Sequence, residues 1–473
     1  MLGEEIFLLC DEIETGSWIY SRLGDGHFDR LRAGILGDKR KQNDRCAEDN
    51  FEHRKSSLND RHSFTARQKM SIGYFPTRPI SIFSPCGDSC GHSCLTSFPC
   101  VDMPAIMLIL SNEEIESFLT IDKCIGALEK AYKSWDEGKA INRPRTDLVM
   151  PSSTEAGVYA FKSMEAGLYD PPIVAMRINS DIIRWQQQGG RVIKTKVPAA
   201  PGNKYVGLVM LFSTATGEPL AMFPDGVVQR MRVASSSALA ARYLAREDAG
   251  TLAILGSGWQ AGSHLPAMCA VRNIKQVNVY SPTQANRETF VKEMAQKVAA
   301  EVRPVDSAEE AMRDADIIAS TTNSLTQVVS PEWVRPGIHL TCVRVPELGD
   351  ETIRKIDRLV IHSHQHAPEN YIAGFGDEGI ESHDAIDIIR KGPAQARESK
   401  VEHPFWLESP ELRDLVTGRA QGRADAHEST CFLNNIGIGL QFAAVGAAVL
   451  SEAKSKGAGH EIPTDWFLET VHP

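Results

Sequence analysis

Two glycines and an alanine, Gly256, Gly258 and Ala261, have the spacing of a phosphate-binding turn. They follow a short apolar run, residues 251–255, that fits a buried strand, and they precede a helical stretch at residues 260–270. The first glycine allows a tight turn, and the second lets the backbone approach a pyrophosphate. Ala261 keeps the helix close to the strand, and the helix N-terminus offers unpaired N–H groups to phosphates. The order strand, turn, helix therefore predicts a dinucleotide-binding site.

The second strand of such a unit, residues 277–280, is followed by side chains that could distinguish NADP from NAD. An acidic residue about twenty positions after the glycines usually binds the ribose 2′-hydroxyl. Here the segment reads Tyr-Ser-Pro-Thr, with Arg287 further on, and contains no carboxylate. Ser281, Thr283 and Arg287 could instead hold a 2′-phosphate. The sequence therefore favours NADP, with NAD as the alternative.

The composition excludes several classes of protein. The chain has 473 residues, of which 42% are hydrophobic and 24% charged, which is ordinary for a globular protein and leaves room for two domains. A net charge of −10 argues against a general nucleic-acid binder. No apolar run is long enough to span a bilayer. Ten scattered cysteines and an acidic N-terminus favour a cytoplasmic protein over a secreted or mitochondrial one.

Residues 1–102 differ from the rest of the chain. The segment 38–70 is dense in charge and poor in aliphatic side chains, which predicts a disordered N-terminal extension.

Two groups of cysteine or histidine residues invite a metal hypothesis, and neither supports it well. Four cysteines between Cys86 and Cys100 accompany His92, but their steps of four, four and six residues miss the spacing of structural zinc sites. His362, His364 and His366 lie in a polar loop without a nearby cysteine or acidic cluster. No metal site is expected.

The elements that would position the nucleotide turn fall into two groups. The first is rich in strands. A strand at residues 108–110 and a helix capped by Ser111 and Glu114 come first, followed by a helix at 121–137. Antiparallel β segments are predicted at 147–150, 158–164, 173–179, 205–213 and 220–223, the last two joined by a hairpin turn.

The second group alternates strands with helices and predicts a doubly wound parallel sheet. An alanine-rich helix at 232–246 precedes the nucleotide turn. An apolar segment at 432–453 is expected to form one helix that packs between domains or subunits. Further strands are predicted at 317–321, 338–343 and 358–361, and helices at 285–301 and 308–313.

From Met107 to its C-terminus the chain resembles the ornithine cyclodeaminase/μ-crystallin family of NAD(P)-dependent oxidoreductases. The resemblance rests on six motifs in this order: Arg143-Pro-Arg-Thr, Arg232 with the alanine-rich helix to Ala245, Leu255-Gly-Ser-Gly-Trp-Gln-Ala261, Ala315-Asp-Ile-Ile, Glu332-Trp-Val-x-Pro-Gly337, and Thr430-Cys-Phe432.

The resemblance implies an α/β fold in which one domain is inserted in another. A Rossmann domain at 231–425 would interrupt an α+β substrate-binding and dimerisation domain made of 107–230 and 426–473, and the protein would be a homodimer. The residues expected to contact the cofactor are Gly256, Ser257, Gly258, Gln260, Ala261, Ser281, Thr283, Arg287, Thr321 and Thr322.

The resemblance also implies which side chains carry the chemistry. Arg145 and Arg232 stand where the family has its carboxylate-binding arginines, since a guanidinium can hold a carboxylate with two hydrogen bonds; Arg143 is an alternative to Arg145. Arg177 stands where a lysine is expected, and an arginine cannot give up a proton at working pH. Water or another side chain would then have to move the proton.

Arg344 marks the second departure from the family pattern. In the deaminating cyclases a loop after the strand at 338–343 carries an aspartate that can activate the attacking group. This chain has Arg344 in that loop, and only Glu347 or Asp350 could substitute for the aspartate.

These departures favour one function over two alternatives. We expect an NAD(P)-dependent oxidoreductase that moves a hydride to or from the α-carbon of a small carboxylate-bearing imino or amino acid. The first alternative is an ammonia-releasing cyclase of the ornithine cyclodeaminase type. The second is a μ-crystallin-like protein that binds NADP and a ligand with little turnover.

Overall fold

The computed structural model describes residues 22–23, 27–28, 105–153, 157–188, 191–324, 326–365, 369–372 and 404–471. The chain divides into two compact units, Met1–Ser97 and Phe98–Pro473. In the first unit β1 (Arg22–Leu23) pairs antiparallel with β2 (His27–Phe28). The predicted disorder at 38–70 and the cysteines around His92 lie outside the described residues. All that follows concerns the second unit.

A ten-stranded sheet of mostly antiparallel strands forms one half of this unit. Its strands run in the order β17-β5-β6-β7-β9-β10-β3-β19, with β4 paired to β6 and β8 paired to β7. Buried and partly buried residues alternate along β6, as expected for a strand with one face on the core. The strands are β3 (Ile106–Ile109), β4 (Ala140–Asn142), β5 (Thr146–Pro151), β6 (Val158–Leu168), β7 (Ile173–Gln188), β8 (Arg191–Val197), β9 (Val206–Ser213), β10 (Pro219–Pro224), β17 (Glu369–Ile372) and β19 (His460–Pro463).

The long hairpin of β7 and β8 was not predicted. We expected a strand that ended at residue 179, but β7 continues to Gln188. Its first part pairs with β9, and its second part pairs with β8. Charged and amide side chains after residue 179 interrupt the apolar alternation on which the prediction relied, so the extension carried no strand signal.

A seven-stranded sheet of parallel strands forms the other half, which confirms the predicted Rossmann-like architecture. The strand order is β13-β12-β11-β14-β15-β18-β16. The strands are β11 (Thr251–Leu255), β12 (Gln276–Tyr280), β13 (Glu301–Pro304), β14 (Ile317–Ser320), β15 (His339–Cys342), β16 (Arg358–Ile361) and β18 (Thr430–Leu433). The helices after its strands are α4 (Ala261–Val271), α5 (Gln284–Met294), α6 (Ala308–Met312) and α7 (Gly349–Arg354).

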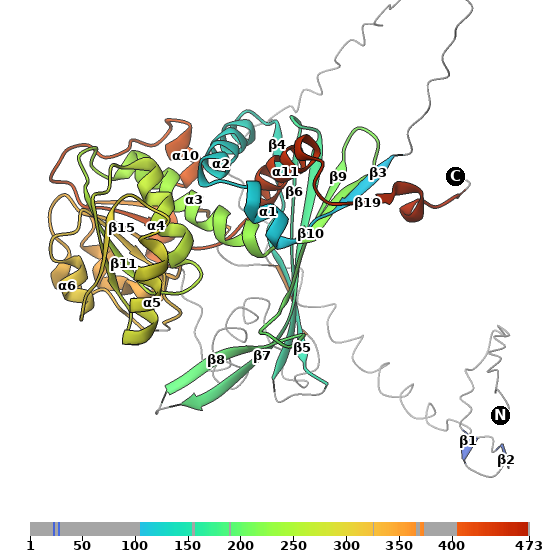
Figure 1. Cartoon of the computed structure of the whole chain (residues 1–473), viewed down its shortest axis with the longest axis horizontal. Helices are drawn as coiled ribbons and strands as arrows, with labels where there is room; N and C mark the ends of the chain where they lie inside the picture. Colours follow the sequence, from blue (N-terminus) through green and yellow to red (C-terminus); the bar gives the residue numbers. More distant parts are fainter. Residues whose placement is uncertain are drawn as a thin grey trace, which may run out of the picture. The chain divides into compact units, whose positions relative to one another are not determined.

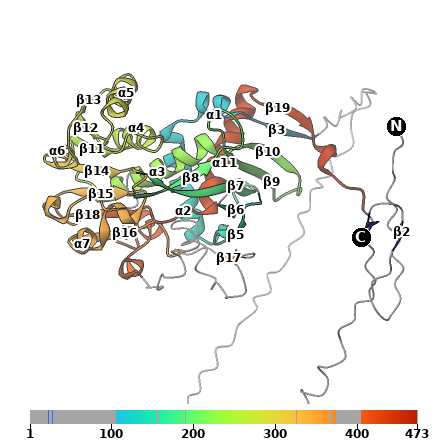
Figure 2. The ribbon, with the colours of Figure 1, turned by 90° about the horizontal axis from the view of Figure 1, so that it is seen from below.

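Three helices lie between the two sheets, as Figures 1 and 2 show: α2 (Ile121–Asp136), α3 (Gly226–Leu244) and α11 (Gly439–Lys456). Helix α11 packs on β6 and β7, while α3 packs on α4, β15 and β18. Helix α1 (Asn112–Phe118) has the predicted capping box of Ser111 and Glu114. The short helix α10 (Leu412–Val416) packs on α2 and α3.

The last apolar segment forms two elements instead of the single helix that we expected at 432–453. Residues 430–433 are a strand, β18, and α11 begins only at Gly439. The β-rich run Thr-Cys-Phe-Leu favours a strand, and two asparagines and Gly437 follow it before the helix. Because β18 pairs with β15 and β16, it lies in the parallel sheet. This pairing differs from the predicted division, which put residues 426–473 wholly with the antiparallel sheet.

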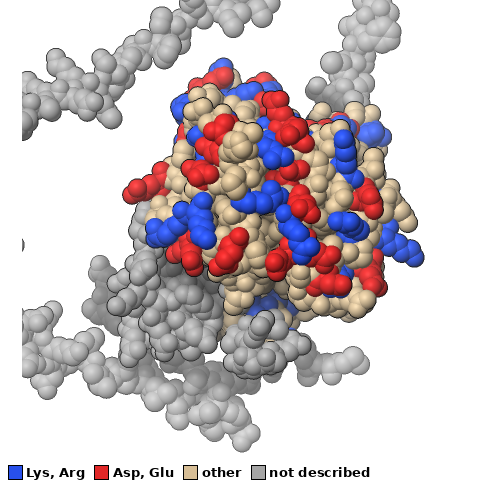
Figure 3. All heavy atoms as spheres, turned by 90° about the vertical axis from the view of Figure 1, so that its left-hand side faces the viewer, with Lys and Arg blue, Asp and Glu red and all other residues tan. Residues whose placement is uncertain are grey.

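The face of the parallel-sheet half that is seen in Figure 3 carries both signs of charge. Lysine and arginine side chains alternate with aspartate and glutamate, and neither sign forms a continuous patch there. In the part of the chain that the structure describes, no helix is long and apolar enough to cross a membrane.

Candidate active site

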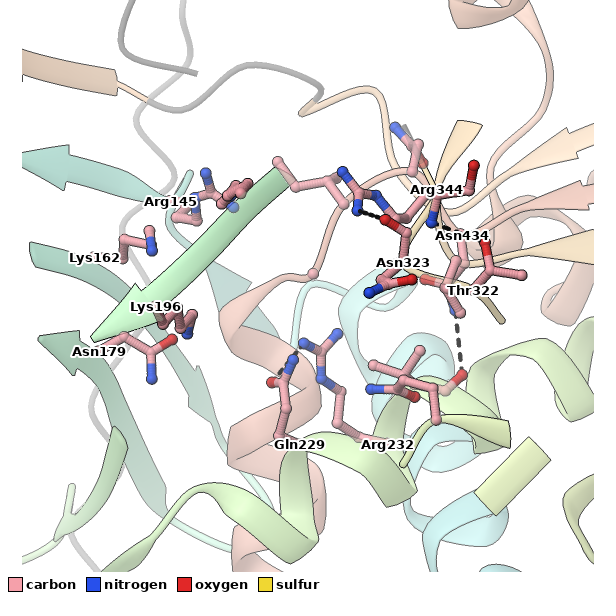
Figure 4. A pocket seen from close by; sticks show the side chains of 18 of the residues that line it. Arg145, Lys162, Asn179, Lys196, Gln229, Arg232, Thr322, Asn323, Arg344 and Asn434 are labelled. Atoms are coloured by element: carbon pink, nitrogen blue, oxygen red, sulfur yellow. Dashed lines mark hydrogen bonds between the residues drawn. The ribbon is translucent and has the colours of Figure 1, made fainter. Parts of the chain in front are cut away.

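A cavity of about 1090 Å³ lies where the carboxyl ends of the parallel strands meet the antiparallel sheet. In an open α/β sheet this edge is where ligands usually bind. Figure 4 shows Arg145, Lys162 and Lys196 on the antiparallel-sheet side, Thr322, Arg344 and Asn434 on the parallel-sheet side, and Arg232 between them. Arg145, Arg177, Arg232, Arg344, Gln260 and Thr322 all line the cavity, as do Lys162, Lys194 and Lys196.

The glycine turn at the end of β11 has the geometry that a dinucleotide needs. Gly256 has a φ of +113°, and a Cβ added there would lie 2.8 Å from the Thr321 carbonyl oxygen, so only glycine fits. A Cβ on Gly258 would meet no atom within 4 Å, which leaves space for a pyrophosphate. Helix α4 begins at Ala261 without a side-chain cap. Its first N–H groups can therefore bind phosphate oxygens, and the residues present fit an NAD(P) cofactor.

Arg232, on α3, is the most informative side chain in the cavity. Its side chain is buried, and its guanidinium donates to two amide oxygens, Gln441 Oε1 and Gln229 Oε1, at 2.7 Å each. Its third donor group, Nε, has no hydrogen-bond partner among the described residues. Burial, reinforced by the nearby Arg177, lowers the pKa of Arg232 to about 9. A buried cation held only by neutral groups is costly unless an anion completes the site.

Arg145 and Arg177 differ from Arg232 because each already has a carboxylate partner. Arg145 donates two hydrogen bonds to the buried Asp147, at 2.9 and 2.6 Å. Arg177 donates two to Asp225, at 2.8 and 2.6 Å. These two arginines are oriented before any ligand arrives.

The alternative to Arg145 is not at the cavity. Arg143 forms an ion pair with Glu165 at 2.9 Å, its side chain is 58% exposed, and it does not line the site. The structure therefore brings Arg145 rather than Arg143 to the cavity.

Helix α11 holds the arginines of α3 and β7 in place. The ring of Phe442 lies 5.0 Å from the Arg232 guanidinium carbon and 5.3 Å from that of Arg177, which are cation–π distances. Gln441, the preceding residue, accepts from Arg232 and donates to Ser236 at 2.5 Å. The C-terminal helix thus contributes directly to the geometry of the site.

The loop after β15 brings Arg344 into the cavity and leaves its carboxylates outside. Arg344 donates to the Asn323 carbonyl oxygen at 3.1 Å. Glu347 is fully buried and accepts from the Thr322 hydroxyl at 2.8 Å. Burial raises the pKa of Glu347 to about 7. Asp350 is exposed, and neither residue lines the cavity.

Lys162 is one of the lining residues that were not predicted from the sequence. It lies on β6, diagonally across from Arg177, because the register pairs Met164 with Arg177 and Lys162 with Asn179. Its ammonium donates to Asp181 Oδ2 at 2.7 Å. Burial lowers its pKa, although the charge of Asp181 opposes this. A lysine two positions before Met164, on the strand that pairs with the arginine-bearing one, was the available signal.

Ser281, Thr283 and Arg287, which were expected to hold a 2′-phosphate, lie after β12 and do not line the cavity. Pro282, between the first two, does line it. Arg287 is buried; it donates to the Ser281 carbonyl oxygen at 3.1 Å and forms an ion pair with Asp306. Thr283 is the N-cap residue of α5 and makes no side-chain capping bond. Arg287 is therefore engaged within the protein, whereas the Thr283 hydroxyl is not used as a cap.

The polar histidine loop has a structural role where the structure describes it. His362 is buried between the Tyr132 hydroxyl, at 2.6 Å from Nε2, and the Ile436 carbonyl oxygen. His364 Nε2 lies 2.9 Å from the Ser409 carbonyl oxygen, and His366 lies outside the described residues. Among the described residues, no group of three or more histidine, cysteine, aspartate or glutamate side chains could hold a metal ion.

Comparison with known proteins gives one consistent result. A model of the ornithine cyclodeaminase/mu-crystallin family matches residues 195–457. The chain is 26% identical over 371 residues to a Delta(1)-pyrroline-2-carboxylate reductase of Bacillus cereus, covering 75% of this chain and 99% of the relative. It is 27% identical over 370 residues to an alanine dehydrogenase of Archaeoglobus fulgidus, covering 75% of this chain and 98% of the relative.

A solved structure resembles this chain. It is the Delta(1)-pyrroline-2-carboxylate reductase of Thermococcus litoralis in complex with NADH and L-proline. The TM-score is 0.58 and the identity 27%, and the match covers 75% of this chain and all of that one.

Proposed function

This chain belongs to the ornithine cyclodeaminase/mu-crystallin family, and we propose that it is an NAD(P)-dependent oxidoreductase of small imino or amino acids. Its reaction would transfer a hydride to or from the α-carbon of a substrate that carries an α-carboxylate. The observation that carries this proposal is Arg232, a buried guanidinium with only amide partners, in the same cavity as Gln260 and Thr322.

The chain's own residues would divide the work as follows. Arg232 binds the α-carboxylate and so fixes the α-carbon in the cavity. Arg177 and Arg145, each neutralised by an aspartate, orient the substrate and shape the cavity wall. Bound NAD(P) supplies the hydride in reduction and accepts it in oxidation.

A proton must also move. In the reductive direction the imine nitrogen gains a proton while the α-carbon gains the hydride, and in oxidation both leave. Arg177 cannot release a proton, but Lys162 can, because burial brings its pKa below that of an ordinary lysine. We therefore assign the proton transfer to Lys162.

The cofactor class is NAD(P), and we propose NADP as the preferred form. Ser281 and Thr283 follow β12, and no acidic side chain stands between them to bind a 2′-hydroxyl. Arg287 gives less support than the sequence suggested, because Asp306 and the Ser281 carbonyl already hold it. Tighter binding of NAD than of NADP in a titration would overturn the preference.

The proposal also covers the assembly of the protein and its location in the cell. We propose a homodimer, the assembly that the family resemblance implies; a light-scattering mass equal to one chain would contradict it. We also propose a cytoplasmic location, in keeping with the four described cysteines, Cys124, Cys269, Cys342 and Cys431, all of which are free. An accumulation of the protein in another compartment would contradict this location.

The two alternative functions have less support from the cavity. An ammonia-releasing cyclase would need a carboxylate that can activate an attacking group, and no acidic residue belongs to the described lining of the cavity. A binding protein with little turnover would not need a buried lysine of lowered pKa beside the ligand.

The oxidation of reduced cofactor by imino acids tests the proposal. Purified protein would be mixed with NADH or NADPH and cyclic imino acids, or with α-keto acids plus ammonium, and the loss of reduced-nicotinamide absorbance would be followed. We expect turnover without ammonia release from the cyclic imines. Ammonia production from ornithine would instead support a cyclase. Tight cofactor binding without any turnover would support a ligand-binding protein.

A further inference from the structure

Tyr132 and His362 form a buried polar pair that has no part in the proposed chemistry. Tyr132 lies on α2 and His362 follows β16, and the tyrosine oxygen is 2.6 Å from His362 Nε2. The two residues are 1% and 2% exposed. A polar pair buried this deeply is stable only when its hydrogen-bonding atoms have partners. The other contacts of this pair lead toward the cavity.

The partners of His362 determine which atom of the pair carries each proton. Its Nδ1 contacts the Ile436 carbonyl oxygen, which can only accept a hydrogen bond. Burial lowers the pKa of His362 to about 4, so the ring is neutral at neutral pH and its one proton is on Nδ1. Nε2 is then the acceptor, and the Tyr132 hydroxyl donates to it.

The carbonyl that His362 binds belongs to the connection between β18 and α11, which lines the cavity. Asn435, Ile436 and Gly437 are all lining residues. Asn435 is bound to the loop of His362 as well. Its Oδ1 accepts from the backbone N–H groups of His362 and Ser363, at 3.0 and 3.2 Å, and its Nδ2 donates to the Ser363 carbonyl oxygen at 2.7 Å. The loop after β16 thus fixes two successive residues of the connection.

Two routes connect this pair to Arg232. The first is the connection itself, because a Cβ on Gly437 would lie only 2.6 Å from Arg232 Nη1. The second passes through α3 and α11. Burial raises the pKa of Tyr132, and hydrogen bonding to Ser236 and Gln441 opposes this rise. Ser236 donates to the Arg232 carbonyl oxygen at 2.9 Å, and Gln441 Oε1 accepts from Nη1 at 2.7 Å.

Arg232 needs support of this kind more than its neighbours do. An aspartate holds each of Arg145 and Arg177 with two hydrogen bonds. Arg232 is held by two neutral amide oxygens, so its orientation depends on how firmly the surrounding elements are fixed.

We propose that Tyr132 and His362 are positioning residues of the carboxylate site, and that their hydrogen bond holds Arg232 in the orientation that binds the substrate. The inference rests on the proposed function and adds two residues to it. Neither side chain lines the cavity, so both act through Arg232 and do not touch the substrate. The bond joins α2, which packs on α3 and α11, to the loop after β16.

Removal of one hydroxyl group tests the pair. Tyr132→Phe keeps the ring and removes the donor to His362. Arg232 would then bind the carboxylate less well in the ground state and in the transition state alike, so KM should rise roughly 10-fold while kcat stays within about twofold of the wild type. Steady-state reduction of a five-membered and a six-membered cyclic imino acid would measure both constants. The dissociation constant for NAD(P)H, from fluorescence titration, should not change.

Tyr159→Phe is the matched control. The Tyr159 hydroxyl bonds to Ser180 Oγ at 3.1 Å, and Tyr159 does not line the cavity. This variant loses a tyrosine hydroxyl and its hydrogen bond, as Tyr132→Phe does, but it should keep the KM of the wild type.

A double-mutant cycle tests whether the two residues act as one unit. His362→Asn keeps an amide N–H that can reach the Ile436 carbonyl oxygen, but it has no atom at the position of Nε2. It therefore breaks the same bond from the other side. The KM of Tyr132→Phe/His362→Asn should be within about threefold of that of the more impaired single variant. Single effects that multiply in the double variant would overturn the inference.

The outcomes separate this inference from the proposed function. If the wild type reduces imino acids and Tyr132→Phe has the same KM, the inference is wrong while the oxidoreductase function stands. It is also wrong if KM and the dissociation constant for NAD(P)H rise together, because the pair would then support the whole cavity. If the wild type binds NAD(P)H but reduces no imine and oxidises no amino acid, the proposed function itself fails.

Discussion

Arg232 and Arg177 show how two buried guanidinium groups on one cavity can have different roles. Arg177 is neutralised by Asp225 at 2.6 Å, so it is complete without a ligand. Arg232 has only the two glutamine oxygens, and its pKa falls to about 9. A substrate carboxylate would supply the missing negative charge. The ion pair then forms only when the ligand binds, so it contributes to ligand affinity and not to the stability of the empty protein.

Arg232→Ala should therefore abolish substrate binding while leaving the cofactor site intact. We expect kcat/KM to fall about 100-fold or more, the size expected for two charge-assisted hydrogen bonds. The dissociation constant for NAD(P)H, measured by fluorescence titration, should change little. Arg242→Ala is the control, because Arg242 lies on the same helix and pairs with Glu129 outside the cavity. Loss of cofactor binding in Arg232→Ala would show that the residue has been given the wrong role.

Lys162 should appear in the pH profile of reduction. The protonated amine is the active form in that direction, so kcat/KM should decline as the pH rises through the Lys162 pKa, which burial places below 10.5. Lys162→Arg keeps the charge but cannot release a proton, so the remaining activity should lack this decline. Lys139→Arg should keep the wild-type profile, since Lys139 is exposed, pairs with Glu137 and lies outside the cavity lining. A decline that is unchanged in Lys162→Arg would assign the proton to another group.

Glu347 should lower the free energy of unfolding as the pH rises. Its pKa is about 7 in the folded protein and 4.5 in the unfolded chain. Between these values the folded state keeps a proton that the unfolded state has lost, so the contribution of Glu347 to stability falls as the pH rises through this range and stays low above it. The change amounts to roughly 1 to 3 kcal/mol.

The variant Glu347→Gln removes this titration without removing the side chain. The difference in Tm between the variant and the wild type, measured by thermal unfolding followed by circular dichroism, should favour the variant more at pH 8 than at pH 5. Glu351→Gln, at an exposed position on α7, should show no such difference. Equal Tm differences for Glu347→Gln at both pH values would mean that Glu347 is already ionised at pH 5.

At the scale of elements, the connection between β18 and α11 determines where Arg232 points. A Cβ on Gly437 would lie 2.6 Å from Arg232 Nη1 and 2.8 Å from Nη2. The guanidinium is the flexible end of its side chain, so Gly437→Ala should displace it at little cost in stability. We expect kcat/KM to fall roughly 10-fold or more, as for a weakened charged hydrogen bond. Steady-state kinetics together with Tm would measure both effects.

A second glycine gives the matched control for this variant. Gly126 lies inside α2, and an added Cβ would meet no atom within 4 Å. Gly126→Ala should keep full activity and be slightly more stable, since alanine favours helices. A fully active Gly437→Ala would mean that the position of Arg232 in the cavity does not depend on this connection.

The elements also show what the sequence could and could not predict. The strand, glycine turn and helix at residues 251–271 were predictable, because apolar period and glycine spacing are local signals. Strand β8 and the end of β7 were not, because charged and amide side chains interrupt the apolar alternation there. On β8, Lys194, Thr195 and Lys196 line a cavity that only the folded sheet creates. The helix expected at 432–453 was wrong at its start for a different reason: the short run Thr-Cys-Phe-Leu favours a strand locally, but its apolar residues continue into the helix, and only its pairing with β15 and β16 separates the two elements.

Among the cavity residues, too, those with a sequence motif could be predicted and those placed by strand pairing could not. The four arginines were predicted from the family motifs and from two departures from them, and all four line the cavity. Lys162 and Lys196 were missed. The position of Lys162, two residues before Met164, is a signal only once β6 is paired with the strand of Arg177, and nothing in the sequence around Lys196 distinguishes a lysine that faces a cavity from one that faces water. Their shared contact with Asp181 exists only once three strands are paired.

At the scale of the whole molecule, the cavity exists only because both sheets contribute to it. The parallel sheet supplies the cofactor turn and Thr322, the antiparallel sheet supplies Arg177 and the lysines, and α3 carries Arg232 between them. This arrangement predicts that the hydride passes directly between the cofactor and a carbon held by the arginines. The α-carbon next to the bound carboxylate is that carbon.

Transfer of deuterium tests this central claim most directly. The protein would reduce an imino acid with NAD(P)H deuterated at C4 of the nicotinamide, separately in each stereochemical position, and the amino acid product would be analysed by mass spectrometry and NMR. We predict one deuterium per product molecule, located at the α-carbon, from one of the two cofactor positions. Amino acid product with no deuterium at the α-carbon from either form would contradict the account.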